Sequence, residues 1–410
     1  IDRGTRLEIA SIAAGGDGVG RSEGIVVFVP RTAPGDVARV RVARAKRFAR
    51  GQLLSLEEPS PARVEPPCPH YTIDRCGGCQ LQHLGYDAQL EAKRVIIGDA
   101  LRRIGRRDVA DPVVEPSDAQ WRYRRKLTLH LRRLASDWIA GLHPYDDPVG
   151  VFDLRDCPIT DERVLALWAQ LRQAFDALPR EGALRVAVRL LDDGAGVTVE
   201  GGRHWRDPDA LLAGAPDVTE IWWRPEEGML RRVAMRSGEH QAGAAFAQVN
   251  AGVAARLRAR LLERVRAYEP AHVIDAYAGT GATAIPLAGD GRRVTAIELD
   301  RAAVDALERR LLPPSQVIAG RVEAHFDRAL PADVVLLNPP RAGVDERVTA
   351  SLEAHRARIR ALFYVSCDPA TLARDLARIP GYRLAAVRGY DMFPQTAHVE
   401  TLCELVPESA

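Results

Sequence analysis

The chain has 410 residues, of which 46% are hydrophobic and 27% are charged, as in an ordinary globular protein. The net charge is +2, so a nucleic-acid-binding surface would have to be local. A chain of this length exceeds one ordinary core, and we expect two or three domains. The sequence contains neither an apolar run that could cross a bilayer nor a signal-peptide pattern. We therefore expect a cytoplasmic protein without a membrane partner, and, because residue 1 is Ile, a short stretch before it.

Residues 1–58 are predicted to form a small β-barrel of the OB-like kind. Alternating apolar runs, such as 6–12 and 37–44, are separated by Gly-containing turns. The second run places Arg39, Arg41 and Arg44 on one side. A basic barrel face can bind nucleic acid, but charge also protects the edge of a solvated strand, and this segment alone favours neither.

A Pro-rich linker at 59–67 precedes three cysteines, Cys68, Cys76 and Cys79, and Cys157 follows further on. In a chain without a secretion signal, cysteines are metal ligands or catalytic groups more often than disulfides. Four thiolates fit either a tetrahedral zinc ion or a four-iron cluster. The Gly-Gly pair before Cys79 and the Pro after Cys157 favour a bulky cluster, although the spacing leaves zinc open.

Residues 66–240 are expected to form a central α+β domain that contacts RNA. An amphipathic helix is predicted at 88–103, and mixed helix and strand at 161–240. Between them, the segment 121–133 carries six Lys or Arg residues and no acidic residue, with aromatic residues among them. Basic groups neutralise phosphates and aromatic rings stack on bases, so RNA contact is favoured over a merely solvated strand. The residues expected to make this contact are Arg122, Arg124, Arg125 and Lys126.

Residues 241–410 have the pattern of a Rossmann-like, doubly wound α/β domain. A helix at 253–268 precedes an apolar strand that ends in Asp275-Ala-Tyr-Ala-Gly-Thr-Gly281, where a helix begins. The next strand ends in an acid, Glu298, at the distance from the Gly turn that suits a ribose hydroxyl. A strand, a Gly turn, a helix and a strand-end acid in this order indicate a nucleotide-binding fold far more specifically than a Gly-x-Gly motif alone.

Three further residues fall at predicted strand ends: Asn338, Cys367 and Glu400. Cys367 follows the apolar strand 362–365 and precedes a helix that begins near Pro369. A thiol there would feel the helix N-terminus, which favours the thiolate. Alone, each residue has a plain structural interpretation, such as a small apolar residue that closes a strand. Together, beside a nucleotide-binding pattern, they predict an active site.

At this point the sequence resembles the RNA 5-methyluridine methyltransferase family, which uses S-adenosylmethionine. The resemblance covers nearly the whole chain, and the N-terminal barrel resembles a TRAM domain. The motifs that carry it are Phe246-Ala-Gln-Val-Asn, Asp275-Ala-Tyr-Ala-Gly-Thr-Gly, Asn338-Pro-Pro-Arg-Ala-Gly, Ser366-Cys-Asp-Pro-Ala-Thr-Leu-Ala-Arg-Asp and Gln395-Thr-Ala-His-Val-Glu-Thr.

The resemblance implies a class I methyltransferase domain at 241–410, after the TRAM barrel and an iron–sulfur domain. It implies that Cys367 is the nucleophile, that Glu400 is the base, and that the four cysteines bind a [4Fe–4S] cluster rather than zinc. Phe246 would contact RNA. The residues implied at the cofactor and target base are Gln248, Asp275, Tyr277, Gly279, Gly281, Ala282, Glu298 and Asn338.

The sequence departs from the family's usual pattern at three places. The family commonly has Asp at the position of Asn338 and Asn at the position of Ala282. The gap between Cys68 and Cys76 is also about two residues longer than the resemblance leads us to expect. We expect a monomer whose substrate is ribosomal RNA rather than transfer RNA. The alternatives are a transfer-RNA uridine or RNA cytosine carbon-5 enzyme, an amino-group methyltransferase with the Asn-Pro-Pro motif, and an inactive RNA-binding iron–sulfur protein.

Overall fold

The computed structural model describes residues 4–45, 48–134, 137–180, 182–191, 194–236 and 248–408. The chain folds into two compact units. The first comprises Ile1–Glu65, His83–Asp118 and Gly252–Ala410, and the second comprises Pro66–Gln82 and Ala119–Ala251. None of the helices in the described ranges combines the length and apolar character that a membrane span requires.

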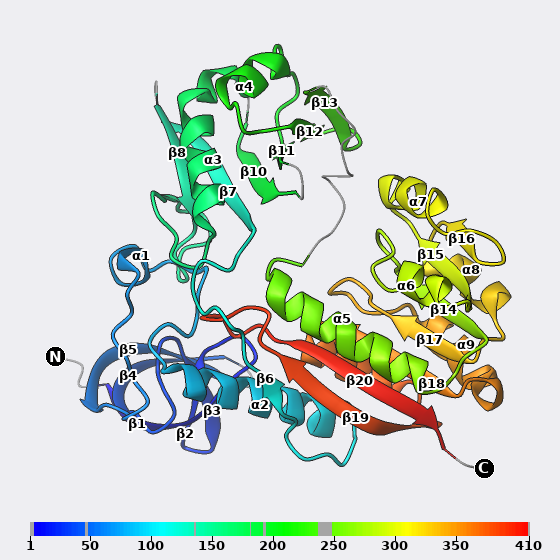
Figure 1. Cartoon of the computed structure of the whole chain (residues 1–410). Coiled ribbons are helices and arrows are strands. Elements are labelled where there is room, and N and C mark those ends of the chain that lie inside the picture. The colour runs from blue at the N-terminus through cyan, green and yellow to red at the C-terminus, as the bar shows by residue number, and fades with distance from the viewer. Residues whose placement is uncertain are drawn as a thin grey trace. The chain divides into compact units, whose positions relative to one another are not determined.

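The first unit begins with a closed five-stranded barrel, which confirms the prediction for the N-terminal region (Figure 1). Alternate residues, such as Leu7 and Ile9, point into its core, because successive side chains of a strand face opposite sides. The barrel strands are β1 (Thr5–Ile12), β2 (Gly18–Ser22), β3 (Ile25–Val29), β4 (Val37–Arg44) and β5 (Ala49–Glu58).

The rest of the first unit is built on an eight-stranded sheet in the order β16-β15-β14-β17-β18-β20-β19-β6. The strands from β16 to β18 run parallel, and β20 pairs antiparallel with both β18 and β19. The strands are β6 (Val114–Glu115), β14 (His272–Ala276), β15 (Arg293–Glu298), β16 (Gln316–Ala319), β17 (Val334–Leu337), β18 (Ala361–Ser366), β19 (Tyr382–Tyr390) and β20 (Glu400–Pro407).

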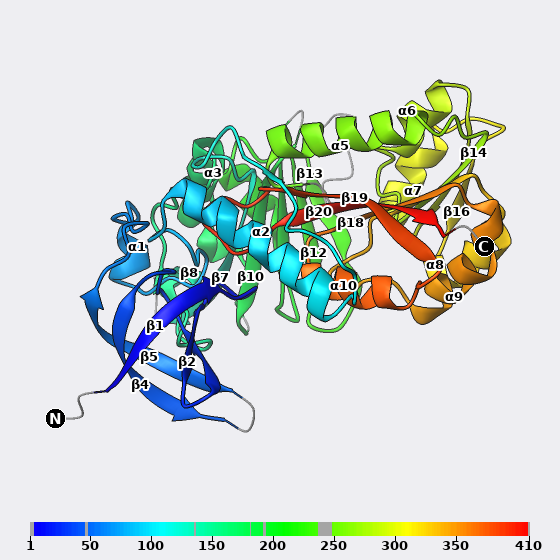
Figure 2. The ribbon, with the colours of Figure 1, turned by 90° about the horizontal axis from the view of Figure 1, so that it is seen from below.

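Helices cover both faces of this sheet, so its central strands β14, β17 and β18 are buried throughout and mostly apolar (Figures 1 and 2). Val334 and Leu336 face the cluster that contains α5, α6 and α7, whereas Val335 and Leu337 face the cluster that contains α2, α8, α9 and α10. The helices are α2 (Tyr86–Arg103), α5 (Ala251–Arg266), α6 (Ala284–Gly289), α7 (Arg301–Glu308), α8 (Val322–Ala329), α9 (Glu346–Ala354) and α10 (Pro369–Ala377).

Helix α2 belongs to the first unit, although the sequence had placed it in the central segment 66–240. Its buried residues Ile97 and Leu101 pack in the same core as α10, and the two helices lie side by side (Figure 2). The observed units therefore differ from the three consecutive segments expected from the sequence. The reason is that the apolar face of α2 finds its partners near the end of the chain.

The second unit holds a seven-stranded sheet in the order β13-β12-β11-β10-β7-β8-β9. The buried side chains of α3 and α4 pack against the apolar face of this sheet. The elements are α1 (Pro69–Thr72), β7 (Lys126–Leu134), β8 (Asp137–Leu142), β9 (Phe152–Asp153), α3 (Glu162–Gln173), η1 (Phe175–Ala177), β10 (Leu184–Leu190), β11 (Ala195–Glu200), α4 (Pro208–Gly214), β12 (Glu220–Arg224) and β13 (Arg231–Met235).

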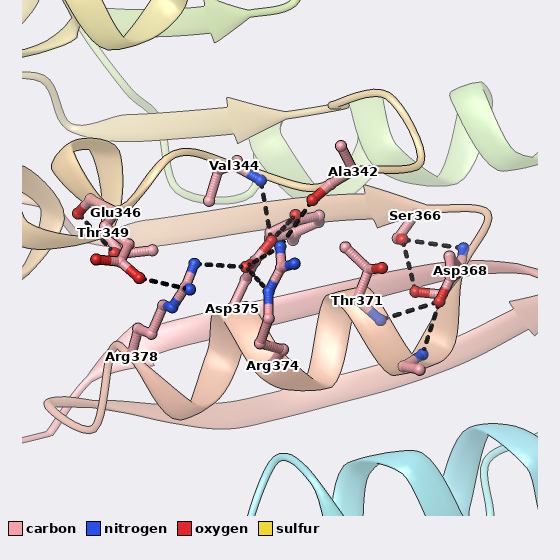
Figure 3. A network of polar contacts seen from close by, with 12 residues as sticks. Ala342, Val344, Glu346, Thr349, Ser366, Asp368, Thr371, Arg374, Asp375 and Arg378 are labelled. Carbon is pink, nitrogen blue, oxygen red and sulfur yellow. Dashed lines mark hydrogen bonds and ion pairs between the residues drawn. The ribbon is translucent and has the colours of Figure 1, made fainter.

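A buried carboxylate, Asp375 of α10, holds the loop that follows β17 (Figure 3). Its Oδ2 accepts from the Val344 backbone N–H at 2.9 Å and from the Tyr364 hydroxyl at 2.7 Å. Its Oδ1 accepts from the guanidinium of Arg374 at 2.7 Å and from that of Arg378 at 3.3 Å. The loop, β18 and α10 are therefore joined through one side chain.

We expect Gly343→Ala to destabilise this junction. Gly343 has a φ of +80°, and an added Cβ would lie 2.2 Å from Oδ2 of Asp375 and 2.5 Å from Cγ2 of Thr371. A left-handed backbone alone costs an L-residue roughly 1–2 kcal/mol, so the free energy of unfolding in urea should fall by at least that amount. Gly289→Ala is the matched control, since no atom lies within 4 Å of its added Cβ. Equal stabilities for the two variants would contradict this account.

Candidate active site

The pairing of β18 with β20 brings two predicted site residues together. Ser366 pairs with Thr401, so the next position brings Cys367 level with Glu400. The charge of Glu400 raises the pKa of the Cys367 thiol, and the nearby Arg341 side chain lowers it. Arg341 also acts electrostatically on Glu400. A thiol, a carboxyl and a guanidinium therefore share one site at the ends of β17, β18 and β20.

Arg341 was not among the residues singled out as functional from the sequence. The signal for it was the motif Asn338-Pro-Pro-Arg341, which places a cation three positions after a strand-end polar residue. Its position became informative only when the fold placed it beside Cys367.

The pKa of the Cys367 thiol is raised, because burial and the nearby charge of Glu400 outweigh the opposing effect of Arg341. Any effect of the helix N-terminus, which was expected to favour the thiolate, is therefore outweighed by burial and by Glu400. Asp368 is the N-cap of α10, and its carboxylate accepts from the backbone N–H groups of Ala370 at 3.0 Å and Thr371 at 2.9 Å. The donors that would have stabilised a thiolate are already bound to a carboxylate.

Glu400 is buried, and burial raises the pKa of its carboxyl to about 7, against the opposing charge of Arg341. Its Oε2 has no hydrogen-bond partner among the residues that the structure describes. A buried carboxyl that titrates near neutrality and has an open acceptor is suited to take up a proton.

The Gly turn after β14 has the shape expected for a nucleotide-type ligand. Gly279 and Gly281 have φ angles of +55° and +86°, and a Cβ on Gly279 would meet no atom within 4 Å. Glu298 is bound to this turn, since its Oε2 accepts from the Gly279 N–H at 2.8 Å. Its Oε1 accepts from the backbone N–H groups of Leu299 and Asp300, each at 2.7 Å. A carboxylate has about four acceptor sites, so one remains for a ribose hydroxyl.

Asp275 supports the turn from within the fold. It is buried, the Thr283 hydroxyl and the Ala284 N–H donate to it, and burial raises its pKa to about 6. Its hydrogen bonds join the end of β14 to the start of α6, which holds the intervening glycines in place.

The other residues expected at the cofactor and target base lie in different surroundings. Tyr277 has a φ of +66° and packs against the core that contains α8 to α10. Ala282 and Asn338 are exposed. Gln248 belongs to the second unit, and Phe246 lies outside the described residues.

The four cysteines predicted as metal ligands are all buried in the second unit. Burial raises the pKa of Cys79, and the charges of Cys157, Cys76 and Cys68 raise it further. The Gly78 N–H also lies 3.4 Å from Sγ of Cys76 and donates to it. Within the described ranges, however, no group of three or more His, Cys, Asp or Glu side chains is arranged to hold a metal ion.

The basic residues predicted to contact RNA divide into two kinds. Arg122 and Arg125 are engaged in the fold, since Arg122 pairs with Asp156 at 2.8 Å and Arg125 donates to the Leu191 carbonyl at 3.3 Å. Lys126 lies opposite Arg189 in the β7–β10 pairing. Burial lowers its pKa to about 8, and the charges of Arg189, Arg185 and Arg124 lower it further. Like charges placed opposite one another are destabilising unless an anion compensates them.

We expect Glu400→Gln to remove a pH-dependent cost in stability. A carboxyl whose pKa rises from 4.5 to about 7 on folding destabilises the protein progressively as pH rises through that window. The free energy of unfolding of the wild type, relative to the Gln variant, should fall by roughly 2–3 kcal/mol between pH 5 and pH 8. Urea unfolding at several pH values measures this, and a constant difference between the two proteins would contradict it.

Comparison with known proteins places these features in a family. Residues 327–406 match the tRNA (Uracil-5-)-methyltransferase family model, and residues 6–54 match the TRAM domain. An uncharacterized RNA methyltransferase of Thermosynechococcus vestitus is 32% identical over 97% of this chain and 97% of its own length. Another from Protochlamydia amoebophila is also 32% identical, over 97% of this chain and 96% of its own.

Among solved structures, the fold is similar to that of the tRNA (uracil-54, C5)-methyltransferase of Pyrococcus abyssi, which was determined in complex with S-adenosyl-L-homocysteine. The TM-score is 0.72 at 25% identity, and the match covers 98% of this chain and 100% of that one. The N-terminal barrel agrees with the match to the TRAM domain, and the fold as a whole is similar to the Pyrococcus abyssi structure over nearly the full length of the chain. The chain therefore belongs to the S-adenosylmethionine-dependent RNA (uracil-5-)-methyltransferase family.

Proposed function

We propose that this enzyme transfers the methyl group of S-adenosylmethionine to carbon 5 of a uridine in RNA through a covalent adduct with Cys367. The observation that carries the proposal is the meeting of Cys367, Arg341 and the buried carboxyl of Glu400 at neighbouring strand ends. Amino-group methylation would require neither a thiol nor a carboxyl there.

The chemistry needs each of these groups. Carbon 5 of uracil is too weak a nucleophile to attack a methyl sulfonium. Addition of the Cys367 thiolate to carbon 6 turns the base into an enolate, whose carbon 5 takes the methyl group. Glu400 then removes the proton from carbon 5, those electrons restore the double bond between carbons 5 and 6, and the bond to sulfur breaks.

Arg341 is the group in this site that favours the thiolate. The ordinary pKa of a Cys is roughly 8.5, and burial raises it further, so the free enzyme holds mostly the thiol. The guanidinium lowers the pKa of the thiol and opposes the charge of Glu400, which lowers the cost of forming the anion. The target base must also leave its stack, which costs a few kcal/mol and less in an unpaired loop.

For the methyl donor, we assign the Gly279–Gly281 turn and Glu298. The turn leaves open space at Gly279, and Glu298 keeps one acceptor site for a ribose hydroxyl. Asn338 is exposed at the end of β17, where it would read the edge of the target base. Its amide can accept from N3–H of uracil and donate to the neighbouring carbonyl, or, when flipped, pair with cytosine.

For the RNA, we propose ribosomal RNA, bound in part by the cationic group around Lys126. Arg124, Arg185 and Arg189 contribute to this group, and Arg185 pairs with Glu200 at 2.9 Å. The cationic charge exceeds that of this carboxylate, which favours phosphate binding. Arg185 and Arg189 come from β10, outside the basic segment that the sequence had indicated.

We further propose that Cys68, Cys76, Cys79 and Cys157 hold a [4Fe–4S] cluster. The support for this proposal is the donor set, four buried thiols whose charges act on one another, although the described side chains are not arranged around a metal position. The N–H group that donates to Cys76 also suits a sulfur with negative charge. The cluster would hold α1 and the segment around Cys157 together in the second unit.

Variants of Cys367 and Glu400 should fail at different steps. Cys367→Ala should lose methyl transfer while still binding RNA, because no adduct with carbon 6 can form. Glu400→Gln should form the adduct and fail to release it, so a methylated protein–RNA conjugate should accumulate on a denaturing gel. Full turnover by Cys367→Ala would contradict the covalent mechanism.

The substrate is checked in the same assay with matched ribosomal and transfer RNA fragments that carry U or C at the target. We expect methylation of the uridine fragment from ribosomal RNA. A preference for cytosine would overturn the choice of base, and a preference for transfer RNA would overturn the choice of RNA. Neither result would alter the roles of Cys367 and Glu400.

Protein purified without oxygen should contain about four iron atoms and sulfide per chain and absorb broadly in the visible range. Cys79→Ser should lose this absorption, because the thiolate of Cys79 is one of four ligands. Cys403→Ser is the matched control, since Cys403 is also buried but lies in the first unit. Stoichiometric zinc without iron would refute the assignment.

A further inference from the structure

The segment 391–399, which joins β19 to β20 and leads into Glu400, is buried although it has no regular secondary structure. Asp391, Met392 and Val399 are fully buried, and Gln395 and Thr396 are 2% exposed. Irregular segments normally lie at the surface, because buried backbone groups must find hydrogen-bond partners. Other parts of the fold must therefore supply partners to this one.

Helix α2 supplies them through two side chains, Gln89 and Lys93. The Gln89 amide makes a reciprocal pair with Gln395: its Oε1 accepts from the Gln395 backbone N–H and its Nε2 donates to the Gln395 Oε1, each at 2.9 Å. Lys93 donates to the Phe393 carbonyl at 3.0 Å. Gln395 has a φ of +71°, a conformation that persists in a non-Gly residue only where its surroundings enforce it.

The same helix also holds the start of the segment through an ion pair. Nζ of Lys93 lies 2.5 Å from Oδ1 of Asp391, and both side chains are 0% exposed. The Tyr86 hydroxyl donates to the other oxygen of Asp391 at 2.8 Å and accepts from the Ser117 N–H at 2.7 Å. A buried ion pair is weak evidence for stability, because desolvation offsets the attraction, but its satisfied hydrogen bonds fix one geometry.

Tyr86, Gln89 and Lys93 are spaced as i, i+3 and i+7, so they share one face of α2. Further along the helix, Ile97 and Leu101 use apolar contacts to pack against the core. The N-terminal half of this helix is therefore a polar clamp, and its C-terminal half is an ordinary apolar anchor.

We propose that Gln89 and Lys93 are positioning residues for proton transfer, because they hold the segment that sets the place of the Glu400 carboxylate. This inference rests on the proposed function, in which Glu400 removes the proton from carbon 5. Glu400 acts only after the methyl group has been transferred. A displaced carboxylate should therefore slow release of the product from Cys367, while formation of the adduct proceeds normally.

The two steps can be separated with RNA that carries 5-fluorouridine at the target. Fluorine at carbon 5 cannot leave as a proton, so the enzyme adds, transfers the methyl group and remains attached to the RNA. The rate of this trapping reports on Cys367 and the methyl donor alone. Turnover on uridine RNA reports in addition on Glu400.

We expect Gln89→Met to lower kcat on uridine RNA at least tenfold. The KM for RNA and the KM for S-adenosylmethionine should both stay within about twofold of the wild-type values. A methylated covalent adduct should accumulate, as with Glu400→Gln, and trapping on 5-fluorouridine RNA should remain within about twofold of the wild-type rate. The double variant Lys93→Met/Asp391→Asn leaves no unpaired charge and should behave in the same way. It replaces Gln89→Met as the test if that variant folds poorly.

Leu101→Ala is the matched control for lost stability, since Leu101 is buried in the apolar half of the same helix. It should lower the melting temperature without accumulating adduct. Arg94→Met, on the exposed face beside Glu91, should resemble the wild type.

Three results would overturn the inference while leaving the proposed function intact. They are a parallel fall of trapping and turnover in Gln89→Met, full turnover by that variant, and accumulation of the same adduct by Leu101→Ala. A wild-type enzyme that is not trapped by 5-fluorouridine RNA would overturn the proposed function and this inference together.

Discussion

The antiparallel pairing of β18 with β20 is the constraint on which the active site depends. In the parallel part of the sheet, functional residues come from loops after strands that all end at one edge. Glu400 instead begins β20, and it reaches that edge only because β20 runs the other way. A shift of one residue in this register would turn Glu400 to the opposite face of the sheet and separate it from Cys367.

Electrostatics then decides the resting state of the site. Burial disfavours the charged forms of both Cys367 and Glu400, and the two would repel one another if both were ionised. Arg341 is the neighbouring cation that acts on both groups. Burial therefore favours the neutral thiol of Cys367 and shifts the titration of Glu400 to near neutral pH. The Asp375 junction is important for the same reason, because it anchors the loop that carries Arg341.

Much of the catalytic half could be predicted from the sequence, because its signals are local. Fully apolar runs such as 334–337 and 361–366 identify buried strands, and the breaks after them identify the residues at the sheet edge. Asn338 and Cys367 were singled out in this way, and Glu400 was singled out from the motif Gln395-Thr-Ala-His-Val-Glu400 before the last strand; their roles stay predictions. The barrel was also found, from its alternating runs and turns.

The features that escaped prediction depend on contacts between distant parts of the chain. Gln89 and Lys93 look like ordinary polar residues of a surface helix, and their partners lie 306 and 298 positions away. The sequence did not show that burial and Glu400 raise the pKa of Cys367, nor that Asp368, its immediate neighbour, caps the helix with its own carboxylate. Local sequence could show a helix N-terminus there, but it could not show which of two adjacent groups would occupy it.

The clamp between α2 and the segment 391–399 also has a consequence for how the chain is made. The ribosome releases Gln89 and Lys93 of α2 before their partners Gln395 and Asp391, which lie 306 and 298 positions further along the chain. Until then, Lys93 and the apolar stripe of Ile97 and Leu101 lack their native partners, while the barrel and much of the second unit can already fold. The nascent chain therefore carries an unfinished helix until these partners are made. The segment 391–399 then completes the clamp and leads into Glu400, the proposed catalytic carboxylate.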